Sequence, residues 1–261
     1  MGVEEKKNRL KKLVGNEQFI SGIYNYCDRW CERCTLRTRC LSFAMDPDLR
    51  TEDSPRTDPD NEAFWQNIHE NFQLAFELLL ESAEEWGIDL NAMDDPVAEE
   101  MERRRERRVE KDPLQRNAMV YAEEVGKWME KHENALVEAG EGMEREIRME
   151  LPNHDPIPSA LALHDAVEVV RWYQFFLYPK ISRALMGLVE DDRDMIDDVL
   201  GTAKITLIAI ERSLGAWQTL GKELQLQDDV LDMQIRLVRI RKELGNRIPG
   251  ALAFKRPGFD E

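Results

Sequence analysis

The chain has 261 residues, of which 42% are apolar, and its 36 basic and 52 acidic residues give a formal charge of −16. This length and composition suit one large domain, or one main domain with a small appendage, and exclude collagen-like and low-complexity chains. Because a surface this acidic repels phosphate backbones, we expect no nucleic-acid binding.

The N-terminal residues and the apolar runs predict a cytoplasmic protein that does not associate with membranes. No apolar core of a secretory signal follows Met1, and Lys6 breaks the myristoylation pattern. The most apolar runs, 175–178 and 205–210, are far shorter than the ~20 residues that cross a bilayer. Since cytoplasmic thiols stay reduced, we do not expect the cysteines to form disulfides.

Residues 1–45 are predicted to form a cysteine-rich, metal-binding head, because they hold every cysteine of the chain. The spacing is C-x3-C-x2-C-x5-C, formed by Cys27, Cys31, Cys34 and Cys40. In an α-helix the first three thiols would share one face, and Cys40 could complete a four-sulfur shell after a turn. Thiolates this close together are costly to hold without a cation, so the spacing predicts a metal site.

Two metal groups suit this spacing, and the sequence leaves both open. Structural zinc takes four thiolates, although it usually uses two separated C-x2-4-C pairs and only one C-x2-C pair occurs here. A [4Fe–4S] cluster also binds compact cysteine runs, although this is not the ferredoxin spacing. Free structural cysteines are the third alternative. Radical SAM enzymes share the C-x3-C-x2-C spacing, but they have a β/α barrel, and this chain shows no strand pattern.

The residues around these cysteines also carry a resemblance. Tyr-Cys-Asp-Arg-Trp-Cys-Glu-Arg-Cys, residues 26–34, resembles the N-terminal block of a family of uncharacterised bacterial proteins. The resemblance covers about 20 residues of this chain. It implies a bacterial, cytoplasmic context and supplies no catalytic assignment.

After the head, the composition predicts an acidic, proline-containing linker at 46–60 and a helical bundle at 61–261. Apolar residues recur at helical spacing in segments at about 61–86, 112–140, 159–188, 194–220 and 222–244. A run of mixed charge at 99–111 predicts a solvated helix. No alternating strand pattern appears, so the predicted fold is an all-α antiparallel helical bundle.

Local residues also predict where these helices begin, end and bend. Asp112 and Pro113 have the pattern of a helix start, and Gly140 is a predicted stop. The segment 159–188 is apolar on nearly all sides, which predicts the central helix. Pro179 lies inside it and should kink or divide it.

Polar side chains on apolar helix faces predict a second site inside the bundle. His132 lies within one apolar stripe, and His164, Glu168 and Arg171 lie at i, i+4 and i+7 on the most apolar segment. We predict these four as cofactor-binding residues, in a metal site or in a cleft for an organic anion. Because the Glu-x-x-His pattern of di-iron bundles is missing, a solvated, salt-bridged helix edge is the plainer alternative.

Three functions follow from these patterns. The first is a metal-binding helical protein whose four cysteines hold an iron–sulfur cluster or zinc, in a structural, redox-sensing or electron-transfer role. The second is an oxidoreductase with a second cofactor or substrate site in the bundle. The third is an acidic scaffold, with a zinc staple, that binds a protein partner with a basic surface. The G-x-S-x-G, P-loop and G-x-G-x-x-G motifs are missing, so whether the protein is an enzyme stays open.

Overall fold

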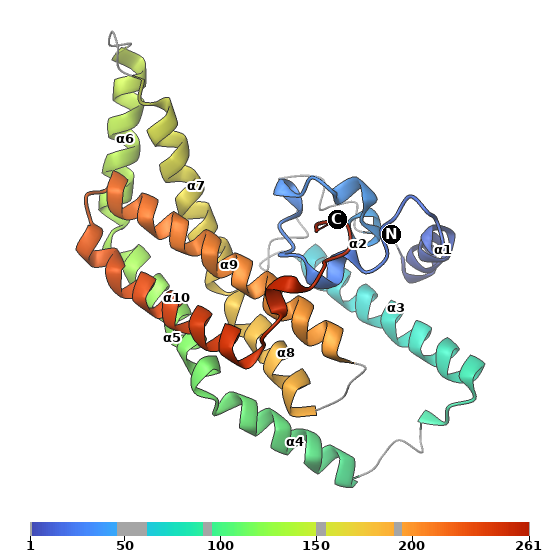
Figure 1. Ribbon diagram of the computed structural model, residues 1–261. Coiled ribbons are helices and arrows are strands. Elements are labelled where there is room, and N and C mark those ends of the chain that lie inside the picture. Colours follow the sequence, from blue (N-terminus) through green and yellow to red (C-terminus); the bar gives the residue numbers. More distant parts are fainter. Residues whose placement is uncertain (1, 46–61, 91–95, 150–154, 191–194, 261) are drawn as a thin grey trace. The chain divides into compact units, whose positions relative to one another are not determined.

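The computed structural model describes residues 2–45, 62–90, 96–149, 155–190 and 195–260, so the predicted linker at 46–60 lies outside the described residues. Within these ranges every regular element is a helix and no strand occurs, which confirms the all-α prediction for them (Figure 1). The chain forms two compact units, Met1–Glu102 with Lys255–Glu261 and Arg103–Phe254.

Unit 1, formed by Met1–Glu102 and Lys255–Glu261, extends beyond the predicted head. It includes the helix that we had predicted to open the bundle, and the next helix runs across the boundary between the units. Its elements are α1 (Val3–Leu13), the 3-10 helices η1 (Ile23–Tyr26), η2 (Cys31–Arg33) and η3 (Arg37–Arg39), α2 (Leu41–Met45), α3 (Glu62–Trp86) and the first part of α4 (Pro96–Glu110).

Ion pairs join α1 to α3 within unit 1. The ammonium of Lys6 is almost fully buried, and it lies 2.9 Å from the Glu70 carboxylate. It also donates to the side-chain oxygens of Asn67 and Asn71, at 2.8 and 2.9 Å. Because an ammonium has three donor hydrogens, these three acceptors satisfy it completely. The burial of a lysine is tolerated here because its charge is both paired and hydrogen-bonded.

Unit 2, Arg103–Phe254, holds most of the buried apolar residues. After α4 it contains α5 (Pro113–Lys131), α6 (Glu133–Met149), α7 (Ile157–Gln174), α8 (Leu177–Glu190), α9 (Ile196–Glu223), α10 (Gln227–Arg247) and the 3-10 helix η8 (Ala251–Ala253). The predicted start of α5 is confirmed, because the Asp112 carboxylate accepts a hydrogen bond of 2.8 Å from the backbone of Leu114.

The centre of unit 2 is α9, and the prediction that 159–188 is the central helix is wrong. Helices α7, α8 and α10 all pack against α9, and buried residues recur along its whole length (Figure 1). Small residues permit this close packing. A Cβ atom on Gly221 would lie 2.8 Å from the Val230 side chain, so only glycine lets α10 approach α9 this closely here.

Two other helix boundaries bear on the predictions. The predicted segment 159–188 is divided into α7 and α8, and Pro179 lies in the first turn of α8, so its predicted effect is confirmed. The predicted stop at Gly140 is wrong, because α6 continues to Met149. One glycine in a helix costs only about 1 kcal/mol, which the neighbouring helix formers offset.

Candidate functional site: the cysteine pocket

The four cysteines lie on a chain of short 3-10 turns. Cys27 follows η1, Cys31 begins η2, and Cys34 and Cys40 cap the ends of η2 and η3. The α-helical alignment expected for Cys27, Cys31 and Cys34 is therefore wrong. Arg29, which lies between the first two, has a φ of 61°, in the left-handed region that breaks a right-handed helix.

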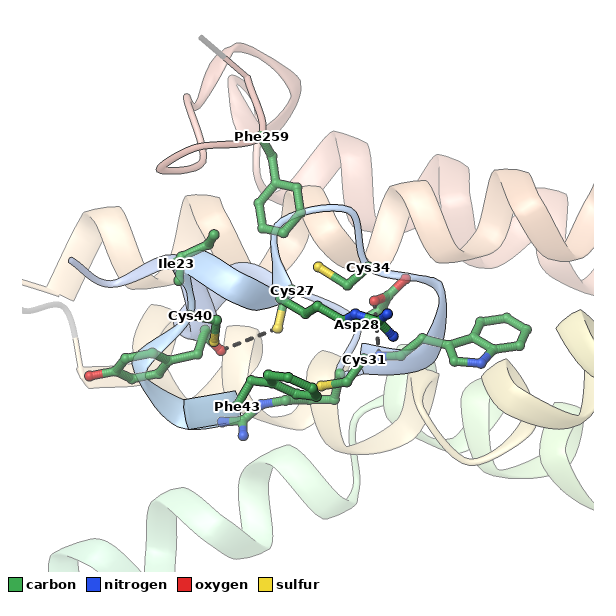
Figure 2. Close-up of a pocket in the computed structure, with 12 residues that line it drawn as sticks. Ile23, Cys27, Asp28, Cys31, Cys34, Cys40, Phe43 and Phe259 are labelled. Atoms are coloured by element: carbon green, nitrogen blue, oxygen red, sulfur yellow. Dashed lines mark hydrogen bonds between the residues drawn. The ribbon is translucent and has the colours of Figure 1, made fainter. Parts of the chain in front are cut away.

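These turns place all four cysteines around one pocket (Figure 2). The cavity has a volume of about 20 Å³, enough for roughly one water-sized sphere. Apolar and aromatic side chains form much of its wall, together with two arginines. The other lining residues are Ile23, Tyr24, Asp28, Arg29, Trp30, Arg37, Phe43 and Phe259.

The thiols in this pocket are partly buried and are not joined in disulfides. Cys27 donates a hydrogen bond of 3.5 Å from its Sγ to the carbonyl oxygen of Tyr24. Burial raises the pKa of the Cys27 thiol, and burial followed by the neighbouring thiols raises the pKa of Cys31 to about 11. These two thiols are therefore neutral at pH 7, and a metal that bound them as thiolates would release protons.

The donor set of this pocket suits a metal that prefers thiolates, and the cavity volume suits a single ion. However, among the side chains that the structure describes, no group of three or more His, Cys, Asp or Glu residues is arranged to hold a metal ion. The four-cysteine metal site, with zinc or an iron–sulfur cluster, therefore stays a prediction.

The basic residues near the pocket have their own contacts. The Arg33 guanidinium lies 3.9 Å from the centre of the Trp30 ring, within the range of a cation–π interaction. Arg29 donates to the Ser42 hydroxyl at 3.4 Å. Arg29 and Arg37 line the pocket, so positive charge lies beside the thiols.

Among the pocket residues that the sequence did not indicate, two follow the last cysteine. Phe43 lies in α2, and Phe259 comes from the C-terminal segment of unit 1, more than 200 residues after the last cysteine. Nothing in the local pattern around Phe259 indicates this position, because the contact depends on how distant parts of the chain fold together.

His132, the first predicted residue of the bundle site, is buried at the C-terminal end of α5. Its ring centre lies 4.6 Å from that of Trp128, and its Nε2 atom lies 3.8 Å from the Asp229 carboxylate. The hydrogen bond from Lys131 is the main cause that lowers the pKa of Asp229. Trp128 and Asp229 also line a groove of about 540 Å³ between α5 and α10.

The other three predicted residues, His164, Glu168 and Arg171, are exposed on α7. His164 Nδ1 lies 3.7 Å from the Glu168 carboxylate, and the His164 side chain is 73% exposed. Even if the imidazole were charged, a contact this exposed would contribute at most about 1 kcal/mol. This arrangement fits the alternative of a solvated helix edge. No described contact joins these residues to His132, so the cofactor-binding assignment stays a prediction.

Comparisons with protein-family models, with curated proteins and with solved structures find no match to this chain. In the part of the chain that the structure describes, no helix combines the length and the apolar character that spanning a bilayer requires.

Proposed function

We propose that unit 1 is a metal-binding module in which Cys27, Cys31, Cys34 and Cys40 share one metal site. A single observation carries this proposal: every cysteine of the chain lines the same small pocket. Four thiols gathered in one partly apolar pocket gain little from their proximity unless they bind something. The proposal includes a closing movement, in which the sulfur atoms approach one another as the metal displaces their protons, which pass to solvent.

A single zinc ion suits this pocket better than a [4Fe–4S] cluster does. The cavity of about 20 Å³ accepts roughly one water-sized sphere, whereas a cluster of four irons and four sulfides requires far more space. With one cysteine sulfur at each of the four vertices of its tetrahedron, zinc would have no open coordination position for a substrate, as in other structural zinc sites.

The proposed role of the metal is structural. Between the end of α1 and the start of α2, the chain has only short 3-10 turns, so backbone hydrogen bonds alone hold it weakly. A metal bound by four of these residues would connect the three turns. In this view residues 1–45 are the predicted metal-binding head and residues 61–261 contain the predicted antiparallel bundle. The protein is cytoplasmic, where its thiols remain reduced.

Single Cys→Ser substitutions at positions 27, 31, 34 and 40 test the shared site. Each should lower zinc affinity by more than the roughly 10–100-fold loss typical of an outer-shell change, since a closed four-ligand site loses a bond to the metal. Thr35→Ser, which creates the same residue outside the pocket lining, is the matched control. Metal analysis after anaerobic purification gives the stoichiometry, and a brown colour would identify a cluster instead of zinc.

The proposal fails if three or more of the four variants retain the metal content of Thr35→Ser. A second result would also contradict it. This is a wild-type protein that, after anaerobic purification, binds neither added zinc nor a cluster formed from added iron and sulfide.

A scaffold that binds a basic partner is the second candidate function, and one face of α3 favours it. Phe72, Phe76, Leu79 and Trp86 are largely exposed, and their spacing places them along one side of the helix. The same helix has glutamates and no lysine or arginine. Exposed apolar side chains bordered by acidic ones suit a basic amphipathic helix as partner.

A further inference from the structure

The C-terminal segment 255–260 is part of the unit that contains the cysteines. Its contacts place Lys255–Glu261 with Met1–Glu102 in unit 1, although the last cysteine is Cys40. Figure 2 shows Phe259 on the opposite side of the pocket from Phe43. The pocket is therefore enclosed by two parts of the chain that are far apart in sequence.

An ion pair holds this segment in a tight turn. The Arg256 guanidinium donates two hydrogen bonds of 3.0 Å to the Asp260 carboxylate, one to each oxygen. The backbone N–H of Arg256 also donates to Asp260, at 2.9 Å, and the backbone N–H of Phe259 donates to the Arg256 carbonyl at 3.1 Å. The guanidinium lies 4.9 Å from the centre of the Phe259 ring. The turn therefore sets the position of the phenyl ring.

Gly258 lets the turn lie directly on the wall of the pocket. Its φ is 76°, which side-chain-bearing residues rarely adopt. A Cβ atom at this position would lie 2.7 Å from Ile20 Cδ1 and 3.4 Å from Ile23 Cδ1. Ile23 itself lines the pocket and is almost fully buried. A larger residue at position 258 would be strained at this φ, and it would have to displace either the Ile20 side chain or the segment that carries Phe259.

From this geometry we infer that the segment 255–260 completes the cysteine site, and that Phe259 restricts access of solvent and competing ligands to the metal. This inference rests on the proposed metal site. An apolar side chain beside metal-bound thiolates excludes water and polar competitors, and the shell around a site controls how easily the metal is reached. Phe259 is a positioning residue, because it offers no atom that can bind the metal.

Zinc release from the full chain tests this inference. Phe259→Ala should release zinc to a competing chelator about 10–100-fold faster than the wild type, with unchanged stoichiometry. Phe72→Ala is the matched control, since Phe72 belongs to the same unit, is exposed and does not line the pocket. Phe259→Leu should restore slow release, because leucine keeps an apolar cover. Gly258→Ala should act like Phe259→Ala by displacing the segment.

Equal release rates in Phe259→Ala and Phe72→Ala would overturn the inference while leaving the metal site intact. Alkylation of the metal-free thiols with iodoacetamide separates this failure from that of the proposed function, because it needs no metal. Faster labelling of the cysteines in Phe259→Ala than in Phe72→Ala supports the cover even if the wild type binds no zinc. Equal labelling rates in the two variants contradict the cover.

Discussion

At the residue scale, a buried tyrosine and a buried tryptophan connect two helices of unit 2. Trp217 of α9 donates a hydrogen bond of 3.0 Å from its Nε1 to the hydroxyl of Tyr121 on α5, and both side chains are fully buried. Trp128 completes the cluster in an edge-to-face arrangement with Trp217, and the two ring centres lie 4.9 Å apart. Burial raises the pKa of Tyr121 to about 12, although its hydrogen bonds with Trp217 and Ser213 favour the charged form.

This raised pKa predicts a specific pH dependence for the Tyr121→Phe variant. A phenol whose pKa is higher in the folded state stabilises the fold fully below its ordinary value of 10.0, and that contribution falls by about 1.4 kcal/mol per pH unit toward pH 12. At pH 8 the variant should be less stable by about 1–3 kcal/mol, because the Trp217 N–H loses its acceptor. The difference from wild type should shrink above pH 10. Urea unfolding between pH 8 and 11 measures it, and a constant difference would contradict the assigned burial of the phenol.

At the scale of the element, leucines of α3 differ in how far they are exposed. Leu74 is 8% exposed, whereas Leu79, one and a half turns later, is 53% exposed. The ion pairs of Lys6 with Glu70 and of Lys7 with Glu77 and Glu81 hold α1 against α3. The helix therefore has a face packed within unit 1 and an apolar face that the scaffold proposal assigns to a partner.

Two identical substitutions on α3 test this division. Leu74→Ala should lower the free energy of unfolding by about 2–5 kcal/mol, because it leaves a cavity in a packed region. Leu79→Ala should change it by less than about 0.5 kcal/mol, as at other exposed positions. Denaturant unfolding of both variants, followed by tryptophan fluorescence and circular dichroism, gives the comparison. If Leu79→Ala is as damaging as Leu74→Ala, the apolar face is already covered in the folded chain and is not free for a partner.

At the scale of the whole molecule, the proposed metal site and most of the core belong to different units. The cysteines and Phe259 lie in unit 1, whereas the core around α9 lies in unit 2. Because metal binding is coupled to the folding of the residues that bind it, removing the metal should affect unit 1 first.

Chelation of the metal should therefore lower the unfolding temperature of one part of the protein and leave the other unchanged. We expect calorimetry of the chelated protein to show two transitions. Unit 1 should unfold at a lower temperature than in the metal-loaded protein, and unit 2 should unfold at the same temperature as in the metal-loaded protein. Most of the helical circular dichroism should persist, since α5 and α7–α10 are all in unit 2. Cys31→Ser, already depleted of metal, should not respond to the chelator. A complete loss of helix on chelation would show that the two units do not fold independently.

The features that the sequence predicted correctly are those set by neighbours along the chain. The Asp112–Pro113 start of α5 depends on a side chain that caps its own helix, and the division at Pro179 follows from a missing backbone N–H. Helical periodicity identified the helices for the same reason, because side chains three and four positions apart share a face. The spacing of the cysteines likewise indicated that they lie close together.

Tertiary structure decided which of these faces are covered and by what. Periodicity identifies an apolar helix face but not the element that packs against it. The sequence therefore did not show that α9, and not 159–188, lies at the centre of unit 2. Nor did it show that one apolar face of α3 is exposed. The cysteine segment adopts 3-10 turns, and residue spacing alone does not distinguish such turns from an α-helix. Phe259 reaches the pocket only because the segment 255–260 folds back onto Ile20 and Ile23, a contact between residues more than 200 positions apart.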